Sequence, residues 1–377
     1  MIHFNSSVSS PHYLSYLQEL NADYLNYRRK IFSEKSLNLL SERYSSSQLF
    51  LCSSATDALE MIAFLMDIQD GDEIIMPSFT FVSTANAFVS HGATPVFVDV
   101  DPETGSMDAN LLEQAISDKT RAVVLVHYLG ICPNIDVFKA FCQKHQLLLI
   151  EDAAMGYGNS TNEMALGSIG DFGVVSFDIT KQMSAVQGGL LLVNNPAFQN
   201  RAQQIYHIGT NRTAFEQGGK PYYEWVDVGS KFQMNELNAA FLFDQLSQQD
   251  QIISRRSELI KQYYQRLINL ANQGFFRILL SEFIEESIHA FVMVLPTPQL
   301  RETLLAYLKE NEIEAMFHYI PLHSSEMGRK CGRFIGGDHT DQLAGTILRL
   351  PVHLHLSNSD VNRVCDVIHS FFSTSKS

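Results

Sequence analysis

Short apolar runs that alternate with helix-patterned segments are the feature that most restricts how this chain can fold. Five runs of five to eight residues stand out in its first 152 residues: QLFLC (48–52), DEIIM (72–76), TPVFVDV (94–100), RAVVLVHY (121–128) and QLLLIED (146–152). Strands of a parallel sheet have this composition, because helices cover both faces of the sheet. The alternation therefore predicts a doubly wound α/β fold with a mostly parallel central sheet.

The pattern changes near Glu236, where residues 236–273 form one long stretch with helical spacing of apolar residues. Beyond it, HAFVMVL (289–295) and LRETLLAYLKENEI (300–313) indicate a smaller α+β unit. A chain of 377 residues is long enough for two domains. We therefore expect a large domain at residues 1–250, which begins with a helical segment, and a small C-terminal domain at residues 251–377.

The charge balance of the chain limits its partners. With 27 basic and 41 acidic residues the formal net charge is −14, which disfavours binding to nucleic acids and to anionic membranes. The five cysteines are scattered, odd in number and never arranged as CxxC, which is typical of reduced thiols in a cytosolic protein. The start of the chain lacks a signal-peptide pattern, and no apolar run approaches the ~20 residues that cross a bilayer. We expect a cytoplasmic protein.

Candidate functional residues follow the ends of the expected strands, where ligands bind in open α/β sheets. After the first run come Ser54 and Thr56, at the start of a helix whose free N–H groups and dipole could bind a phosphate. Plain N-capping by Ser54 would give the same pattern. After the second run come Phe79 and Phe81, each of which could pack in the core or stack on a flat ring.

Two ionisable residues lie next to apolar runs, where burying a charge would cost free energy unless the charge is paired or neutralised. Asp152 directly follows a buried-looking run and therefore needs a cation or a hydrogen-bonding turn. Lys181 lies between the strand patterns GVVSF (173–177) and GGLLLV (188–193), so it is either a solvated loop residue or an amine that is used chemically. An anion site, an aromatic plate, a carboxylate and a lysine at one sheet edge together match what pyridoxal phosphate needs.

Other groupings in the sequence are weaker. His318 and His323 lie five residues apart, and His353 and His355 share one face of a possible strand, but neither pair has cysteines or carboxylates at zinc spacing. We interpret them as core or surface histidines and expect no metal. The chain has no GxGxxG, Walker A or GxSxG motif, so a nicotinamide-dependent dehydrogenase is a remote alternative.

An ordered set of motifs extends over nearly the whole chain: SSATDALEM, LMDIQDGDEIIMPSFTFVSTANAFV, VFVDVDPETG, VHYLG, EDAAMG, VSFDITK, GTNR, MNELNAAFL and FHYIPLH. In this order the set resembles the sugar-nucleotide aminotransferases of the DegT/DnrJ/EryC1/StrS group. The resemblance implies the fold of aspartate aminotransferase, known as fold type I, with pyridoxal 5'-phosphate as the cofactor. It also implies a homodimer whose subunits share active sites.

The resemblance assigns roles to individual residues. Lys181 would bond covalently to the cofactor and move a proton, Asp152 would bind the pyridine nitrogen, and Phe81 would stack on the ring. Tyr319 and His323, in FHYIPLH, would lie near the sugar nucleotide. The remaining cofactor contacts would come from Ser54, Ala55, Thr56, Met155, Ser176, Lys231 and, from the partner subunit, Asn211.

The reaction implied moves an amino group, we expect from glutamate, to the keto carbon of a nucleotide-linked 4-keto-6-deoxy sugar. The expected acceptor is dTDP-4-keto-6-deoxyglucose, in the synthesis of cell-surface polysaccharide. Amination at C3 and a non-catalytic binding or regulatory role stay open as alternatives. Met155, where the family usually has Gln or His, and a shortened glycine turn at Gln187 motivate the non-catalytic alternative. Related sugar 3-dehydratases have His in place of Lys181, which argues against dehydration.

Overall fold

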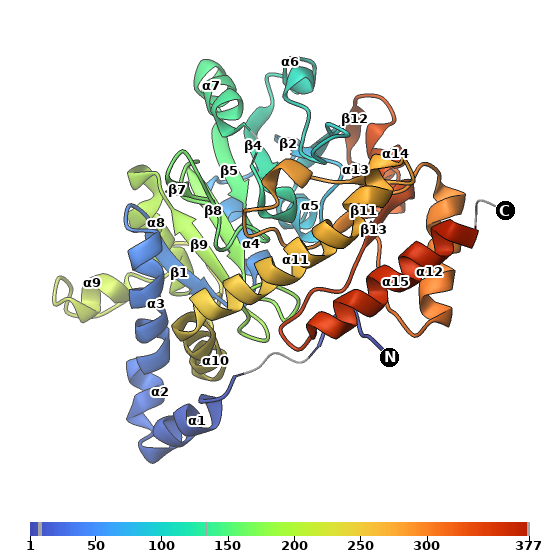
Figure 1. The fold of residues 1–377 in the computed structure, drawn as a ribbon. Helices are drawn as coiled ribbons and strands as arrows, with labels where there is room; N and C mark the ends of the chain where they lie inside the picture. The colour runs from blue at the N-terminus through green and yellow to red at the C-terminus, as the bar shows by residue number, and fades with distance from the viewer. Residues whose placement is uncertain (7–9, 133, 375–377) are drawn as a thin grey trace.

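The centre of the computed structural model, which describes residues 1–6, 10–132 and 134–374, is an eight-stranded sheet (Figure 1). Its order is β1-β9-β8-β5-β4-β2-β3-β12, in which β9 runs antiparallel to both its neighbours and all other pairs are parallel. The predicted α/β fold is confirmed. The strands are β1 (Gln48–Cys52), β2 (Glu73–Pro77), β3 (Thr94–Val98), β4 (Thr120–Val126), β5 (Leu148–Asp152), β8 (Phe172–Ser176), β9 (Gly189–Val193) and β12 (Arg333–Ile335).

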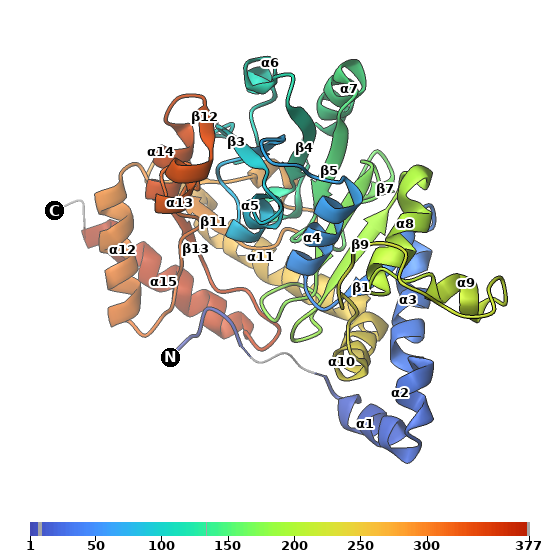
Figure 2. The same cartoon turned by 180° about the vertical axis from the view of Figure 1, so that it is seen from behind.

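Alternate residues of the central strands enter two different cores, one on each face of the sheet. In β4, Val123 and Leu125 join one core, whereas Ala122 and Val124 join the other. Figure 2 shows the second face covered by α4 (Ala55–Leu65), α5 (Val82–Val89) and α8 (Pro196–Tyr206). The first face is covered by α3 (Ile31–Arg43), α7 (Ile135–His145) and α10 (Glu236–Ser247).

The C-terminal part of the chain has its own core and a second, smaller sheet, as the sequence predicts. This antiparallel sheet consists of β10 (Arg277–Ile278), β11 (Val292–Val294) and β13 (Ile347–Arg349). It packs against α11 (Gln249–Asn272), α12 (Pro298–Glu310) and α15 (Asn358–Thr374). β12 nevertheless pairs with β3 of the large sheet. The division at residue 250 stays a prediction.

The remaining elements are short. They are α1 (Tyr13–Ala22), α2 (Leu25–Arg29), η1 (Ala109–Leu111), α6 (Leu112–Ala115), η2 (Tyr128–Gly130), β6 (Ser160–Thr161), β7 (Met164–Ala165), α9 (Arg212–Glu216), η3 (Ser281–Phe283), α13 (Glu326–Cys331) and α14 (His339–Thr346). No helix among the described residues is long and apolar enough to cross a membrane.

The sheet brings the expected site residues to one edge. β5 ends at Asp152 and runs parallel to β8, which ends at Ser176. The chain then turns through Lys181 and returns as β9, with Gly189 opposite Ser176. Because parallel strands end at the same edge, the carboxylate of Asp152 and the lysine segment emerge side by side.

Candidate active site

A cavity of about 550 Å³ lies at the carboxyl edge of the large sheet. Two walls form it. The strand-end wall comes from β5, β8, the β8–β9 turn and the starts of α4 and α5, and the C-terminal wall includes His289, His318 and Arg349. Nine of the predicted site residues line the cavity, namely Ser54, Ala55, Thr56, Phe81, Asp152, Met155, Ser176, Lys181 and Tyr319.

Lys181 lies in the turn between β8 and β9 and is half-buried in the cavity wall. Its backbone N–H donates to the carbonyl of Asp178 at 3.0 Å, which holds the turn. Burial lowers the pKa of the Lys181 amine, and this effect outweighs the carboxylates of Asp152 and Asp178, which raise it; the cation of Arg349 lowers it further. A lowered pKa enlarges the fraction of free amine, which is the nucleophilic form.

Asp152 is buried at the floor of the cavity, with 6% of its surface exposed. The Thr84 hydroxyl donates to its Oδ2 at 2.7 Å, and the backbone N–H of Ala154 donates to its Oδ1 at 3.1 Å. In the described parts of the chain no cationic side chain forms an ion pair with it. A buried carboxylate of this kind is oriented by its hydrogen bonds and suits a protonated ring nitrogen from a ligand.

The start of α4 forms another part of the strand-end wall. Ser54 is the N-cap, and its hydroxyl accepts the N–H of Asp57 at 3.0 Å, so the capping interpretation is correct. Ser54, Ala55 and Thr56 also line the cavity, so the N–H groups at the start of α4 could bind an anion there. β9 approaches this turn so closely that a Cβ on Gly189 would lie 2.4 Å from the Ala55 nitrogen. Only glycine permits this approach.

The two phenylalanines that follow β2 have different environments. Phe79 is 1% exposed and packs edge-on against Tyr128, with ring centroids 5.1 Å apart. Phe81 is 59% exposed and lines the cavity, where a flat ring could stack on it. The sequence left both interpretations open for both residues. The structure assigns Phe79 to the core.

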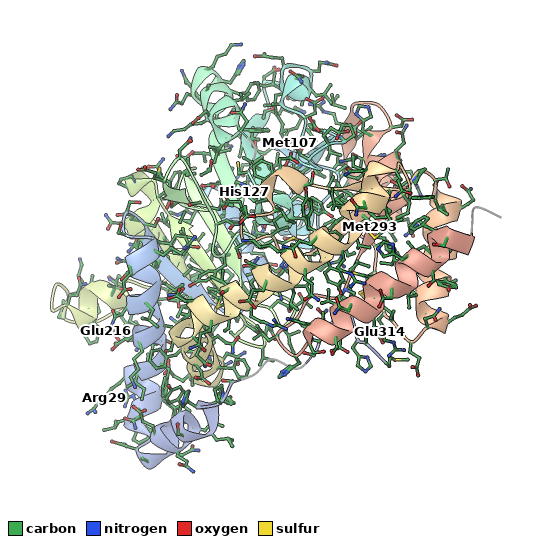
Figure 3. All side chains as sticks on the ribbon, in the orientation of Figure 1. Arg29, Met107, His127, Glu216, Met293 and Glu314 are labelled. Carbon is green, nitrogen blue, oxygen red and sulfur yellow. The ribbon has the colours of Figure 1, made fainter. Side chains whose placement is uncertain are left out.

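A buried ion pair lies behind the strand-end wall. His127, labelled in Figure 3, lines the cavity, and its Nε2 is 2.8 Å from Oε2 of Glu151. Burial alone would lower the pKa of His127, but Cys132 and Glu151 raise it to about 10. The carboxylate of Glu151 also accepts the N–H groups of Gly167, Ile169 and Gly170. Glu151 thus fixes the end of β5 that carries Asp152.

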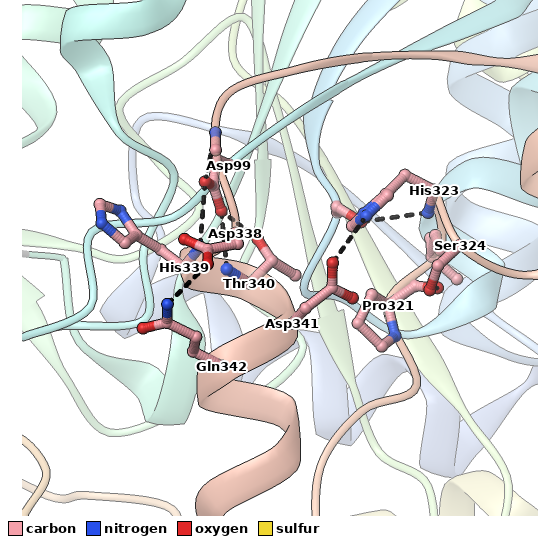
Figure 4. Close-up of polar contacts among 12 residues, drawn as sticks. Asp99, Pro321, His323, Ser324, Asp338, His339, Thr340, Asp341 and Gln342 are labelled. Carbon is pink, nitrogen blue, oxygen red and sulfur yellow. Dashed lines mark hydrogen bonds and ion pairs between the residues drawn. The ribbon is translucent and has the colours of Figure 1, made fainter.

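Three predicted site residues do not line the cavity of their own chain. Lys231 is exposed, and the Asn211 side chain accepts the N–H of Glu224 at 2.9 Å beside α9. The ring of His323 lies 2.7 Å from the Ser78 hydroxyl and 3.3 Å from Asp341 (Figure 4). Their roles toward cofactor and substrate stay predictions.

Several cavity residues were not predicted, and they come from both walls of the cavity. Arg349 lines the cavity and interrupts the apolar run ILRLP. A charged residue inside an apolar run is a sequence signal for a buried functional group. Thr84 is a buried polar residue in a helix, and only its hydrogen bond to Asp152 reveals its role. Among the described residues, no three His, Cys, Asp or Glu side chains cluster as a metal site.

The residues present fit pyridoxal phosphate. Lys181 could bond to its aldehyde, the carboxylate of Asp152 could bind its ring nitrogen, and the start of α4 with Ser176 could hold its phosphate. When bound, this cofactor acts as an electron sink that stabilises negative charge on a carbon attached to nitrogen. The chain itself supplies an orienting carboxylate and an amine that can carry a proton.

Comparison with known proteins agrees with this geometry. The model of the DegT/DnrJ/EryC1/StrS aminotransferase family matches residues 42–369. The dTDP-4-dehydro-2,3,6-trideoxy-D-glucose 4-aminotransferase of Saccharopolyspora spinosa is 30% identical over 327 residues, which cover 85% of this chain and 83% of that protein. Two solved structures have the same fold. The aminotransferase TlmJ from Streptoalloteichus hindustanus matches with a TM-score of 0.87 and 25% identity over 100% of both chains. The pyridoxal-phosphate form of Spr1654 from Streptococcus pneumoniae matches with a TM-score of 0.86 and 22% identity over 98% of both chains.

The family match extends over most of the chain, and the aminotransferases of this family depend on pyridoxal phosphate. The lysine and the carboxylate that such chemistry requires line one cavity. The chain therefore belongs to the DegT/DnrJ/EryC1/StrS aminotransferase family and is a pyridoxal-phosphate-dependent sugar aminotransferase.

Proposed function

We propose that this enzyme moves the amino group of glutamate to C4 of a nucleotide-linked 4-keto-6-deoxy sugar, with dTDP-4-keto-6-deoxyglucose as the acceptor. The reaction would take place in the cytoplasm and supply an amino sugar for cell-surface polysaccharide. The observation that carries the transfer chemistry is that Lys181 and the buried carboxylate of Asp152, which has no ion-pair partner among the described residues, line one cavity. The motifs resemble those of dTDP-4-amino-4,6-dideoxygalactose transaminase, and the Saccharopolyspora relative is named for amination at C4 of a dTDP sugar.

The chain's own residues would contribute positioning and proton transfer. Lys181 Nζ would accept the proton from the α-carbon of the donor and return a proton to the sugar carbon that gains the amine. Asp152, held by Thr84 and Ala154, would keep the bound ring nitrogen protonated. The buried walls would exclude water from the reacting atoms.

The absorbance spectrum of the purified protein with pyridoxal phosphate tests this proposal. We expect a visible band from covalently bound cofactor that is absent in Lys181→Ala, and its loss when L-glutamate is added. Addition of dTDP-4-keto-6-deoxyglucose should restore the band and yield an amino sugar, whose NMR spectrum reports C4 or C3. A product aminated at C3 would overturn the regiochemistry, and an unreactive sugar would overturn the acceptor. No band would contradict the proposed reaction itself.

We further infer that the enzyme works as a homodimer whose subunits share active sites. Trp225 is 80% exposed, and its apolar neighbours Tyr222, Tyr223, Val226 and Val228 are 45–63% exposed. These residues follow α9, which projects from the body in Figure 1. Exposed apolar surface of this kind is typical of an interface, and a second copy of the chain would cover it.

Mixing variants tests the shared site. Asn211 lies next to this projecting arm, and the resemblance assigns it to the cavity of the partner. If a site combines Lys181 of one subunit with Asn211 of the other, co-expressed Lys181→Ala and Asn211→Ala chains should regain activity that neither variant has alone. A monomeric mass in solution, or no recovery on mixing, would contradict the shared site.

A further inference from the structure

Gln182 directly follows Lys181, but its side chain is not part of the cavity wall. It is 5% exposed, and its amide meets Ser287 in the loop between η3 and β11. Nε2 of Gln182 donates to the Ser287 carbonyl at 2.8 Å, and the Ser287 hydroxyl donates to Oε1 of Gln182 at 3.1 Å. Both polar atoms of a buried amide thus bind one residue that lies 105 positions away in the chain.

A second buried amide holds the same loop independently of Gln182. Asn159 is 4% exposed, and its Oδ1 accepts the N–H of Ser287 at 2.9 Å. Its Nδ2 donates to the carbonyl of Ser287 at 3.1 Å and to that of Gly130 at 2.7 Å. Because Asn159 already fixes Ser287, the bonds of Gln182 have a different consequence, which is to fix the turn that carries Lys181.

The turn around Lys181 has further hydrogen bonds on both sides of Gln182. The N–H of Lys181 donates to the carbonyl of Asp178 at 3.0 Å. Nδ2 of Asn238 donates to the carbonyl of Gln187 at 2.7 Å. Between these two points, Gln182 ties the turn to the C-terminal part of the chain. Neighbouring Cα atoms are about 3.8 Å apart, so Gln182 fixes the backbone within one residue of the amine-bearing side chain.

The loop that Gln182 binds also carries part of the C-terminal wall. His289 lies two residues after Ser287 and lines the same cavity as Lys181. Burial lowers the pKa of His289 well below its usual value, and the charge of Lys181 lowers it further. Burial also lowers the pKa of Lys181, and the cation of Arg349 in this wall adds to that effect. Interactions between charges depend on distance, so a fixed turn keeps both pKa values constant.

We propose that Gln182 is a positioning residue for the amino transfer, because its two bonds to Ser287 hold the Lys181 turn at a fixed distance from the C-terminal wall. This inference rests on the proposed role of Lys181 as the amine that carries a proton between donor and sugar. Proton transfer requires heavy atoms about 2.6–3.2 Å apart, and a displacement of about 1 Å can cost about 10²-fold in rate. A lysine side chain is long and flexible, so its reach is reproducible only from a fixed backbone.

The test compares Gln182→Leu, which keeps a similar size and removes both bonds, with Gln262→Leu. Gln262 also donates from Nε2 to a carbonyl, that of Asn358 at 2.9 Å, but it joins α11 to α15 outside the cavity. In the protein loaded with pyridoxal phosphate, Gln182→Leu should slow the single-turnover step with L-glutamate at least about 10-fold. The apparent affinity for L-glutamate should change less than about 2-fold. Gln262→Leu should change neither quantity.

Two measurements separate positioning from a purely structural role. Hydrogen exchange in the peptide that covers residues 178–187 should become faster in Gln182→Leu and stay unchanged in Gln262→Leu. In the cofactor-free protein, the pH at which capture of pyridoxal phosphate accelerates should rise in Gln182→Leu. The reason is that a turn that moves away from Arg349 and toward water gives Lys181 a higher pKa. A loss of stability alone would lower the midpoint of chemical denaturation and leave this pH unchanged.

Ser287→Ala tests the other partner, because it removes the hydroxyl donor and leaves the carbonyl acceptor. We expect about a 3-fold slower step with L-glutamate, and a double variant no slower than Gln182→Leu alone. An unchanged rate in Gln182→Leu, an unchanged pH for cofactor capture, or fully additive losses in the double variant would overturn the inference. If Gln182→Leu does not fold, Ser287→Ala carries the same comparison. A parent enzyme that does not respond to L-glutamate would contradict the proposed function instead, and hydrogen exchange would still report whether Gln182 holds the turn.

Discussion

Asp152 in the strand-end wall and Arg349 in the C-terminal wall differ in how far their polar atoms are satisfied within the chain. In the strand-end wall, Asp152 accepts two hydrogen bonds and Ser54 caps α4. In the C-terminal wall, Arg349 has a buried Nε without a partner and one long hydrogen bond. Asp152 and Ser54 are thus oriented by hydrogen bonds within the chain, whereas the guanidinium of Arg349 makes one long hydrogen bond. Substitutions in the two walls should therefore have different effects.

The largest effect should come from Lys181→Ala, which removes the reactive amine from the strand-end wall. We expect the rate of amino transfer to fall by at least about 10³-fold, because both the covalent bond to the cofactor and the proton carrier are lost. The melting temperature should stay close to that of the parent. Lys309→Ala, at an exposed position of α12 outside the cavity, is the control and should keep full activity. An active Lys181→Ala enzyme would contradict the role of the lysine.

Asp152→Asn should have the next largest effect, about 10²-fold on kcat, since a neutral amide cannot hold a protonated ring nitrogen. Thr84→Val keeps the carboxylate and removes only the 2.7 Å hydrogen bond that orients it. We expect a loss of about 5-fold for Thr84→Val, the size of one hydrogen bond. If both variants lose activity equally, orientation rather than charge is what Asp152 provides.

Gly189→Ala tests the close approach of β9 to α4. The new Cβ would lie 2.4 Å from backbone atoms of Ser54 and Ala55, so the start of α4 must move. We expect the free energy of unfolding to fall by about 1–3 kcal/mol and the affinity for pyridoxal phosphate to fall with it. Gly219→Ala is the control, because its nearest contact would be 3.2 Å and its backbone needs no left-handed conformation. Chemical denaturation and cofactor titration measure both effects, and an unchanged affinity would argue against phosphate binding at this turn.

The smallest effects should be opposite shifts in the pKa of Lys181. The carboxylate of Asp178 raises this pKa and the cation of Arg349 lowers it, so Asp178→Asn should lower the pKa and Arg349→Gln should raise it. Covalent capture of pyridoxal phosphate by the cofactor-free protein requires the free amine. The rate therefore rises as the pH passes through the pKa, and this rise should move to lower pH in Asp178→Asn and to higher pH in Arg349→Gln. Shifts in the same direction would show that the charges of the two walls do not act on Lys181 as described.

The strand-end wall could be predicted from the sequence because a sheet places its strand ends by a simple rule. Asp152 and Ser176 end neighbouring parallel strands, so the alternation of strands and helices was enough to bring them together. Short-range geometry was harder to predict. Phe79 and Phe81 follow the same strand two residues apart, and only the start of α5 turns Phe81 toward the cavity.

The C-terminal wall could not be predicted in the same way. β13 has three residues, and its place at the cavity depends on how the smaller sheet docks on segments far away in the chain. The N-terminal Phe4 meets Arg349 across 345 positions, which no local pattern encodes. The motifs of the resemblance pointed to Tyr319, which lines the cavity, and to His323, whose ring is hydrogen-bonded to Ser78 and whose role toward the substrate stays a prediction.

The most direct test of the central claim is to locate the cofactor on the chain. Protein loaded with pyridoxal phosphate would be reduced with borohydride, digested and analysed by mass spectrometry. The account predicts one phosphopyridoxyl group, on the peptide that contains Lys181, and its absence when excess L-glutamate is added before reduction. A group on a different lysine, or no group on any lysine, would contradict the assignment of Lys181 as the residue that binds the cofactor.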